Sequence, residues 1–389
     1  MLCNIESCTG CGACVNICPK DCIKLQYDKY GFLQPHINVS ECISCGRCDA
    51  VCPVLNATEQ CNYTEPICYA GWNKDAKVRH DSSSGGMFSA LAEYVFSLGG
   101  IACGVVLDNK LNPYHTVAST KDDVKRMRGS KYLQSDTKLI FRQVKKALLL
   151  NRYVLFSGCP CQIAGLYTFL ENKKCEKLIT CEIVCHGVPS ISVFNWYKAY
   201  LEKKASSSIV DVDFRSKKYG WSVSAMDFLY ANGGRGTIKA QNNLFMKAFY
   251  ASLSIRKSCV ECSYAKLPRV ADFTIGDYWR AVVQNYSKKE RKNGISLILI
   301  NNEKAANVIS VIKDKIFFEP ITLQDAMTEN TNIANFGKVN PKRDKFLSEY
   351  KHSDVQYLMT KYFPITIKSH ISAILGKRLI YRIKAVIKK

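Results

Sequence analysis

Acidic residues are scarce in this chain of 389 residues, which has 33 Asp and Glu against 55 Lys and Arg and a formal net charge of +22. Such a surface attracts nucleic acid, anionic membrane faces and acidic or phosphorylated ligands. No recognised nucleic-acid-binding motif accompanies the charge, so we expect no nucleic-acid partner. The charge alone does not choose between the other classes.

Long apolar runs are also missing. No stretch approaches the roughly 18 consecutive apolar residues that mark a membrane-spanning helix. A secretory signal begins with a basic segment that is followed by an apolar run, and the N-terminus at residues 1–4 shows no such pattern. We therefore expect a cytoplasmic protein whose 20 cysteines are reduced rather than paired in disulfides. With 47% hydrophobic residues, the chain has room for a substantial core and about two or three domains.

Cysteine, in contrast, is abundant, and eight cysteines repeat one spacing twice. The pattern Cys-x2-Cys-x2-Cys-x3-Cys-Pro occupies residues 8–19 and again residues 42–53. In this spacing three cysteines wrap one iron-sulfur cube and the fourth binds the other cube. A zinc knuckle or a disulfide framework is the alternative, which the repeat disfavours. We predict a domain over residues 1–55 with two 4Fe-4S clusters, one held by Cys8, Cys11, Cys14 and Cys52, the other by Cys42, Cys45, Cys48 and Cys18.

The rest of the chain alternates helical and strand patterns. Residues 23–31 predict a hairpin between the two cysteine repeats, and residues 56–69 form a linker. Short apolar strands over 101–107, 153–156 and 177–184 alternate with helices, which favours an α/β core with parallel pairing. We expect one module in two parts, over 70–190 and 191–340, followed by a basic helical tail over 341–389.

Two segments of this module have groups that suit phosphate. Ser83, Ser84, Gly85 and Gly86 open a helix, where free amides and the helix dipole favour an anion. The alternative is that Ser84 only caps the helix and the glycines allow tight packing. Residues 128–135 gather polar and basic groups, and a solvated loop is the alternative for them.

A second set of cysteines follows the predicted strands. Residues 158–162 read Gly-Cys-Pro-Cys-Gln, and Cys185 and His186 follow the next strand. The carboxyl ends of such strands face the crevice where α/β sheets bind ligands. With a later Cys-x-x-Cys, a third four-thiolate cluster is predicted, and zinc is the competing metal. Its ligands would be Cys161, Cys185, Cys259 and Cys262, with Cys159 and Cys181 as alternates. The remaining cysteines, among them Cys3, Cys22, Cys61, Cys68, Cys103 and Cys175, are expected to be small apolar fillers.

From about residue 69 to residue 319 the chain resembles the beta subunit of coenzyme F420-dependent hydrogenases and dehydrogenases. The motifs that carry the resemblance are Ser-Ser-Gly-Gly at 83–86, Gly-Ser-Lys-Tyr at 129–132, Pro-Cys-Gln at 160–162, Cys-His-Gly at 185–187, Cys-x-x-Cys at 259–262 and Gly-Asp-Tyr-Trp at 276–279. Cys159 precedes the Pro-Cys-Gln motif at a position where the commoner form of this motif has threonine. The exact ligands of the third cluster therefore stay open.

The resemblance implies an FAD and one further 4Fe-4S cluster, with a deazaflavin as two-electron partner in archaeal members. The implied fold class is α+β, a bacterial-type ferredoxin fold followed by a mixed α/β flavin and iron-sulfur module. The cofactor-binding residues would be Ser83, Ser84, Gly85, Gly86, Ser130, Lys131 and Gln162. Lys131 would also tune the flavin charge as a catalytic residue. His186 would shuttle protons, unless it only holds a loop by a hydrogen bond.

These features predict an iron-sulfur flavoprotein oxidoreductase. It would pass electrons between 4Fe-4S clusters and a two-electron organic substrate or deazaflavin-like coenzyme through FAD. The alternative is an electron-transfer subunit that feeds a partner enzyme and has no substrate of its own. Either function needs a redox partner protein or ferredoxin. Residues 364–389 contain seven Lys or Arg and no acid, and we expect this amphipathic helix either to contact an anionic inner membrane face or to pack on the protein.

Overall fold

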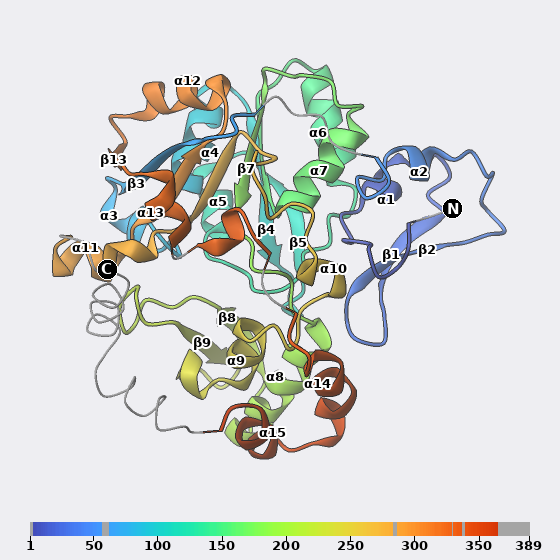
Figure 1. Ribbon diagram of the computed structural model, residues 1–389, viewed down its shortest axis with the longest axis vertical. Helices are drawn as coiled ribbons and strands as arrows, with labels where there is room; N and C mark the ends of the chain where they lie inside the picture. The colour runs from blue at the N-terminus through green and yellow to red at the C-terminus, as the bar shows by residue number, and fades with distance from the viewer. Residues whose placement is uncertain (1–2, 57–61, 283–285, 329, 337–338, 365–389) are drawn as a thin grey trace.

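The computed structural model describes residues 3–56, 62–282, 286–328, 330–336 and 339–364. In Figure 1 the N-terminal segment forms a small lobe beside a larger unit built on a sheet. A third lobe lies below that unit and contains β8 (Ile209–Asp213), α8 (Ile191–Ala205) and α15 (Val355–Tyr362). Among the described residues, no helix is both long and apolar enough to cross a membrane. The amphipathic helix predicted over 364–389 lies outside the described residues, apart from its first position, and stays a prediction.

The N-terminal lobe contains the predicted hairpin. Strand β1 (Ile23–Tyr27) pairs antiparallel with β2 (Leu33–Ile37), which confirms the prediction. Each cysteine repeat carries a short helix, α1 (Ala13–Ile17) or α2 (Arg47–Ala50). Both helices begin after a glycine with positive φ, +81° at Gly12 and +69° at Gly46. Other residues rarely adopt this left-handed conformation, so glycine lets each cysteine loop turn tightly into its helix.

The larger unit is built on one mixed sheet of eight strands in the order β13-β3-β12-β11-β7-β6-β4-β5. The strands are β3 (Ile67–Asn73), β4 (Ile101–Leu107), β5 (Pro113–Ala118), β6 (Val154–Gly158), β7 (Leu178–Ile183), β11 (Phe273–Asp277), β12 (Ser296–Ile300) and β13 (Ile316–Pro320). The expected parallel pairing is confirmed between β4, β6, β7 and β11. The remaining pairs are antiparallel, so the sheet is mixed.

Helices cover both faces of this sheet because successive side chains on a strand point to opposite faces. Leu155 of β6 lies in the core below α4 and α12, whereas Val154 and Phe156 pack with α6 and α7. The helices that surround the sheet are α3 (Ala76–His80), α4 (Met87–Ser97), α5 (Lys121–Met127), α6 (Ile140–Leu149), α7 (Pro160–Phe169), α11 (Lys288–Asn293), α12 (Glu303–Ile312) and α13 (Leu323–Thr328). Ala13 of α1 joins the α6 and α7 side, so the N-terminal lobe docks on this face.

The third lobe has its own aromatic core around a three-stranded antiparallel sheet, which is formed by β8 (Ile209–Asp213), β9 (Ala225–Tyr230) and β10 (Arg235–Lys239). Phe194, Phe214, Phe245 and Tyr350 are buried together in that core. The helices of the lobe are α8 (Ile191–Ala205), α9 (Leu244–Tyr250), α14 (Arg343–Glu349) and α15 (Val355–Tyr362). The described part of the C-terminal tail therefore packs against the protein.

Candidate functional site

A cavity lined by cysteines lies where β6 and β7 end. Helix α7 starts directly after β6, with Cys159 at its N-cap and Pro160 at its first position. The side chain of Gln162 holds this turn, because its Oε1 accepts the Cys159 amide at 3.0 Å and its Nε2 donates to the carbonyl of Ser135 at 3.2 Å. Gln162, predicted to bind a cofactor, thus positions the first cysteine segment.

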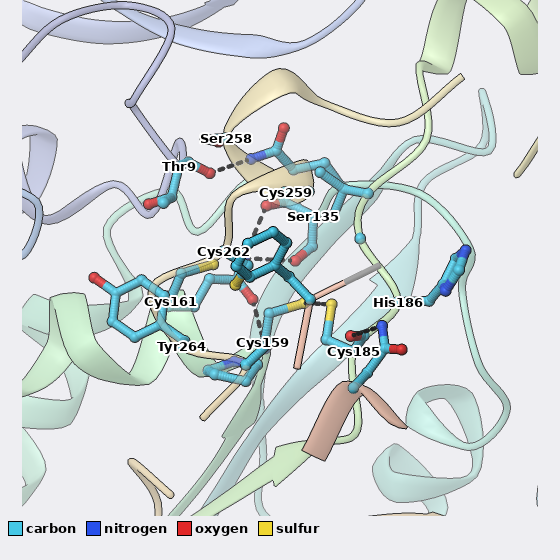
Figure 2. Close-up of a pocket in the computed structure, with 18 of the residues that line it drawn as sticks. Thr9, Ser135, Cys159, Cys161, Cys185, His186, Ser258, Cys259, Cys262 and Tyr264 are labelled. Atoms are coloured by element: carbon cyan, nitrogen blue, oxygen red, sulfur yellow. Dashed lines mark hydrogen bonds between the residues drawn. The ribbon is translucent and has the colours of Figure 1, made fainter. Parts of the chain in front are cut away.

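Five cysteines from three distant segments line this cavity, namely Cys159, Cys161, Cys185, Cys259 and Cys262 (Figure 2). The four predicted ligands of the third cluster are therefore brought together, with Cys159 as a fifth thiol. The Cys159 and Cys185 sulfurs are 4.0 Å apart. Cys181, the other alternate, is fully buried elsewhere, in the core with Leu155 and Ile179.

The electrostatics of the cavity favour a cation among the sulfurs. Burial raises the pKa of Cys161, and it raises the pKa of Cys259 to about 12, because a bare thiolate is poorly solvated there. Thiolates are the metal-binding form of cysteine, and metal binding displaces their protons. A cationic metal centre would therefore supply the positive charge that compensates the negative charge of the buried thiolates.

A buried ion pair fixes two of the cysteine segments. Glu182 of β7 and Arg269 are almost inaccessible to solvent and form a direct ion pair. Arg269 also donates to the carbonyls of Tyr264 at 2.9 Å and Ile333 at 3.0 Å. Glu182 lies three residues before Cys185, and Arg269 lies after the Cys-x-x-Cys loop. The pair therefore ties the two loops to each other at the wall of the cavity.

The same cavity is held against the first cysteine loop of the N-terminal lobe. The buried guanidinium of Arg256 donates to the carbonyls of Cys8 and Leu33, each at 2.7 Å. It also reaches the side-chain oxygens of Gln34 at 2.8 Å and Gln134 at 3.0 Å. Ser258 adds a hydrogen bond to the carbonyl of Cys8 at 2.9 Å. The loop that carries Cys259 and Cys262 thus forms a second contact with the N-terminal lobe, besides the α6 and α7 face.

Tyr264 lies between the cavity and the first ferredoxin site. Its hydroxyl donates to the carbonyl of Pro53 at 3.2 Å, next to Cys52, and its ring lines the cavity (Figure 2). Burial raises the pKa of Tyr264, and so do the thiols of Cys11 in the ferredoxin site and Cys161 in the cavity. The phenol therefore stays protonated and can donate. On α7, a Cβ added to Gly165 would lie 2.9 Å from the Cys11 sulfur. Tyr264 and helix α7 therefore connect the cysteine cavity to the first ferredoxin site.

The predicted ferredoxin ligands also fall into two groups. Cys8, Cys11, Cys14 and Cys52 line one small cavity together with Cys3. Cys18, Cys42 and Cys48 gather in another cluster with Cys22, and Cys45 in the same loop is exposed. Cys3 and Cys22 were expected to be inert fillers, but each contacts predicted ligand thiols. Cys68 and Cys103 are buried, as expected for fillers.

Comparison with known proteins agrees with this arrangement. Residues 68–140 match the N-terminal model of the coenzyme F420 hydrogenase/dehydrogenase beta subunit, and residues 151–325 match its C-terminal model. This chain belongs to that family. Residues 7–56 match a 4Fe-4S dicluster domain. The predicted resemblance is thus confirmed, and the chain has an oxidoreductase role with iron-sulfur electron transfer.

A search of the curated proteins found no match. Among solved structures, the chain is similar to a chain of the F420-reducing [NiFe] hydrogenase complex from Methanosarcina barkeri. The two are 18% identical, with a TM-score of 0.48, and the similarity covers 75% of this chain and 94% of that chain.

In this beta-subunit family member, the two predicted phosphate segments touch each other. The Ser83 hydroxyl accepts the Ser130 amide at 2.6 Å. The next two residues contact the beginning of β12. The Ser84 hydroxyl donates to the carbonyl of Ile295, and the Gly85 amide donates to the Ser296 hydroxyl, both at 2.9 Å. Helix α4 begins at Gly86 without a side-chain cap, so Ser84 is not the helix cap.

Lys131 lies at the end of α5. Its Nζ donates to the carbonyls of Arg126, Met127 and Arg128, at 3.2, 2.9 and 2.7 Å. These contacts place the ammonium at the negative end of that helix. Burial lowers the pKa of Lys131 to about 7. Its role in neutralising a flavin or phosphate stays a prediction.

His186 lines the cysteine cavity, but its ring points away from the sulfurs (Figure 2). The ring packs edge-on against Phe249 at 5.1 Å between centroids. Its Nε2 is buried and has no hydrogen-bond partner in the part of the chain that the structure describes. Burial lowers the pKa of His186, which favours the neutral ring. The predicted proton transfer by His186 remains untested.

Arg215 is a functional candidate that the sequence did not single out. Its side chain is buried, and Nη2 donates to the carbonyl of Trp221 at 2.8 Å. A carboxylate oxygen of Asp277 is 3.8 Å away, and the guanidinium lies over the Trp279 ring at 5.0 Å. Within the described residues, Nε and Nη1 have no hydrogen-bond partner. A buried guanidinium with two unpaired donors is suited to an anion or to a polar ring edge.

Two family motifs lie near this arginine, and a third contacts the same basic segment. Asp277 and Trp279 come from the motif at 276–279, and Tyr132 of the motif at 129–132 packs edge-on against Phe214, the residue before Arg215. Lys217 donates to the carbonyls of Arg79 and Ser84, each at 2.7 Å, which joins the same basic segment to the Ser-Gly loop. The only sequence signal was the basic run at 215–218 after a strand.

Proposed function

We propose that the chain is an iron-sulfur flavoprotein oxidoreductase that exchanges electrons between 4Fe-4S clusters and a two-electron organic substrate. The strongest support is the five-cysteine cavity, which Arg256, Ser258 and Tyr264 hold against the first ferredoxin site. FAD, when bound, would supply the conversion between single-electron and two-electron transfer. Membership of a beta-subunit family also supports a redox partner protein.

We assign three sets of cluster ligands. The ferredoxin clusters would be held by Cys8, Cys11, Cys14 and Cys52, and by Cys42, Cys45, Cys48 and Cys18. The third cluster would be held by Cys161, Cys185, Cys259 and Cys262. A chain purified without oxygen should then contain about twelve irons, an equal amount of sulfide and one FAD. Iron, sulfide and flavin analysis tests this composition. A content of about eight irons would contradict the third cluster, because it corresponds to two 4Fe-4S clusters.

The residues around Arg215 fit an FAD. The cofactor has a negative pyrophosphate and a planar ring with polar edges, and both suit buried donors beside aromatic side chains. Arg215 supplies two unpaired donors, and Trp279 and Tyr132 lie close to its charge. The contact between Ser83 and Ser130 brings the two phosphate segments to the same region. We place the flavin in this region of the module.

Replacing Arg215 with methionine should remove the flavin and leave the clusters in place. Two hydrogen bonds to a charged or polar ligand, each about 1.5–3 kcal/mol, correspond to an affinity loss of about 100-fold or more. Flavin absorbance after gel filtration measures the loss, and iron content and circular dichroism report on folding. Arg235→Met changes an exposed arginine on β10 and is the matched control. Full FAD retention in Arg215→Met would contradict this site.

An electron-transfer subunit without its own substrate is the second candidate. Cys45 is exposed, and Val39 and Ile43 beside it are 80% and 57% exposed, which suits contact with a redox protein. Anaerobic assays with a small hydride donor, such as a reduced deazaflavin, separate the two. Turnover by the isolated chain supports an enzyme with its own substrate. Complete reduction without turnover, until a partner protein is added, supports the second candidate.

A further inference from the structure

Each ferredoxin site contains a fifth thiol. The sulfur of Cys22 lies 3.4 Å from that of Cys18 and is also close to Cys42. Cys3 lines the same small cavity as Cys8 and Cys52, and its thiol lowers the pKa of both. Neither Cys3 nor Cys22 belongs to the repeated pattern. Each extra thiol is therefore within direct contact of two proposed ligands.

The two extra thiols occupy the same corner of the two sites. In both sites the extra thiol contacts the first cysteine of one repeat and the fourth cysteine of the other. Cys3 contacts Cys8 and Cys52, and Cys22 contacts Cys18 and Cys42. One corner of each site therefore carries a spare sulfur.

The two thiols reach this corner from positions that the repeat does not relate. Cys22 follows the fourth cysteine of the first repeat by four residues, and Asn56 holds that position in the second repeat. Asn56 donates instead to the carbonyls of Asp49, Ala50 and Cys52. Cys3 precedes the first repeat by five residues, where the second repeat has Ile37. Two unrelated positions thus deliver a thiol to equivalent corners, which packing alone does not require.

We propose that Cys3 and Cys22 are reserve ligands, each able to bind the cluster iron that the neighbouring fourth cysteine otherwise holds. This inference rests on the cluster ligands proposed above. In the exchange one iron-thiolate bond breaks and another forms, and the proton of the incoming thiol passes to the departing thiolate. Iron and charge balance without an oxidant or reductant. The replacement is local, because Cys3 shares one small cavity with Cys8 and Cys52.

Paired alanine variants of the full chain test the proposal, with iron content and the electron paramagnetic resonance spectrum of the reduced protein as readouts. Cys52→Ala should keep about twelve irons, with a changed spectrum for one cluster. Cys3→Ala with Cys52→Ala should lose about four irons. Cys3→Ala alone should keep all of them. Cys11→Ala changes the second cysteine of the repeat, which is not at the corner of Cys8 and Cys52, so it should also lose about four irons and is the matched control.

The second site provides an independent repeat of the experiment. Cys18→Ala should keep its cluster through Cys22, whereas Cys18→Ala with Cys22→Ala should lose it, as should Cys48→Ala. Equal iron loss in Cys52→Ala and Cys11→Ala, or in Cys18→Ala and Cys48→Ala, would overturn the reserve-ligand proposal while leaving the ligand sets intact. Full iron in Cys11→Ala and Cys48→Ala would instead overturn the proposed ligand sets, and with them this inference.

Discussion

Arg256→Met is expected to loosen the first cysteine loop of the ferredoxin lobe from the rest of the protein. The change removes four hydrogen bonds from a buried guanidinium and leaves the carbonyl of Leu33 and the oxygens of Gln34 and Gln134 without that donor. A buried acceptor that is left without its donor costs about 1–3 kcal/mol. Hydrogen exchange of residues 8–14 and the free energy of unfolding measure the effect. Both should change strongly, with faster exchange and lower stability.

The neighbouring residue is a close control for this experiment. Lys257 pairs with Glu6 at 2.7 Å, but both side chains are more than half exposed. Exposed ion pairs contribute about 0–1 kcal/mol. Lys257→Met should therefore leave exchange in the 8–14 loop close to that of the wild type. Similar exchange in both variants would show that Arg256 is not what holds the lobe.

Cys259→Ala combined with Cys262→Ala should remove about four of twelve irons and leave the two ferredoxin clusters spectroscopically intact. The two cysteines are half of the proposed ligand set for the third cluster, and Cys159, the fifth thiol of the cavity, can replace only one of them. Iron analysis and electron paramagnetic resonance after reduction measure the change. Cys159→Thr, which restores the commoner form of the motif, should keep all of the iron. Loss of a ferredoxin cluster in the double variant would contradict the separation of the sites.

The sequence predicted the features that depend on short residue spacing and on the order of the strands, namely the cysteine loops, the hairpin and the sheet edge that carries the cysteines. Each cysteine repeat encodes its own loop, and the hairpin between the repeats followed from local alternation. Parallel pairing of β6 with β7 then placed Cys159, Cys161 and Cys185 at one sheet edge, as expected from their positions after the strands. These features depend on neighbours in the chain or on one general rule of sheet topology.

Contacts between distant segments were not predictable. Arg256 reaches the carbonyl of Cys8 across 248 positions of sequence, and nothing in a basic residue before a Cys-x-x-Cys loop specifies that contact. The phosphate segments were found separately, but the hydrogen bond between Ser83 and Ser130 needed the fold. The spacing of Cys3 and Cys22 matches no ligand pattern, so the sequence predicts that they are fillers. Their proximity to Cys8 and Cys18 exists only in three dimensions.

The unequal burial of the two ferredoxin sites has a consequence for how the protein matures in the cell. Cys8, Cys11 and Cys52 are each less than a tenth exposed, and α7, Arg256 and Tyr264 close over them. Cys45 in the other site remains open to solvent. A carrier protein can deliver iron and sulfide to the open site after folding is complete. We expect the closed site to be loaded before the N-terminal lobe docks on the rest of the protein.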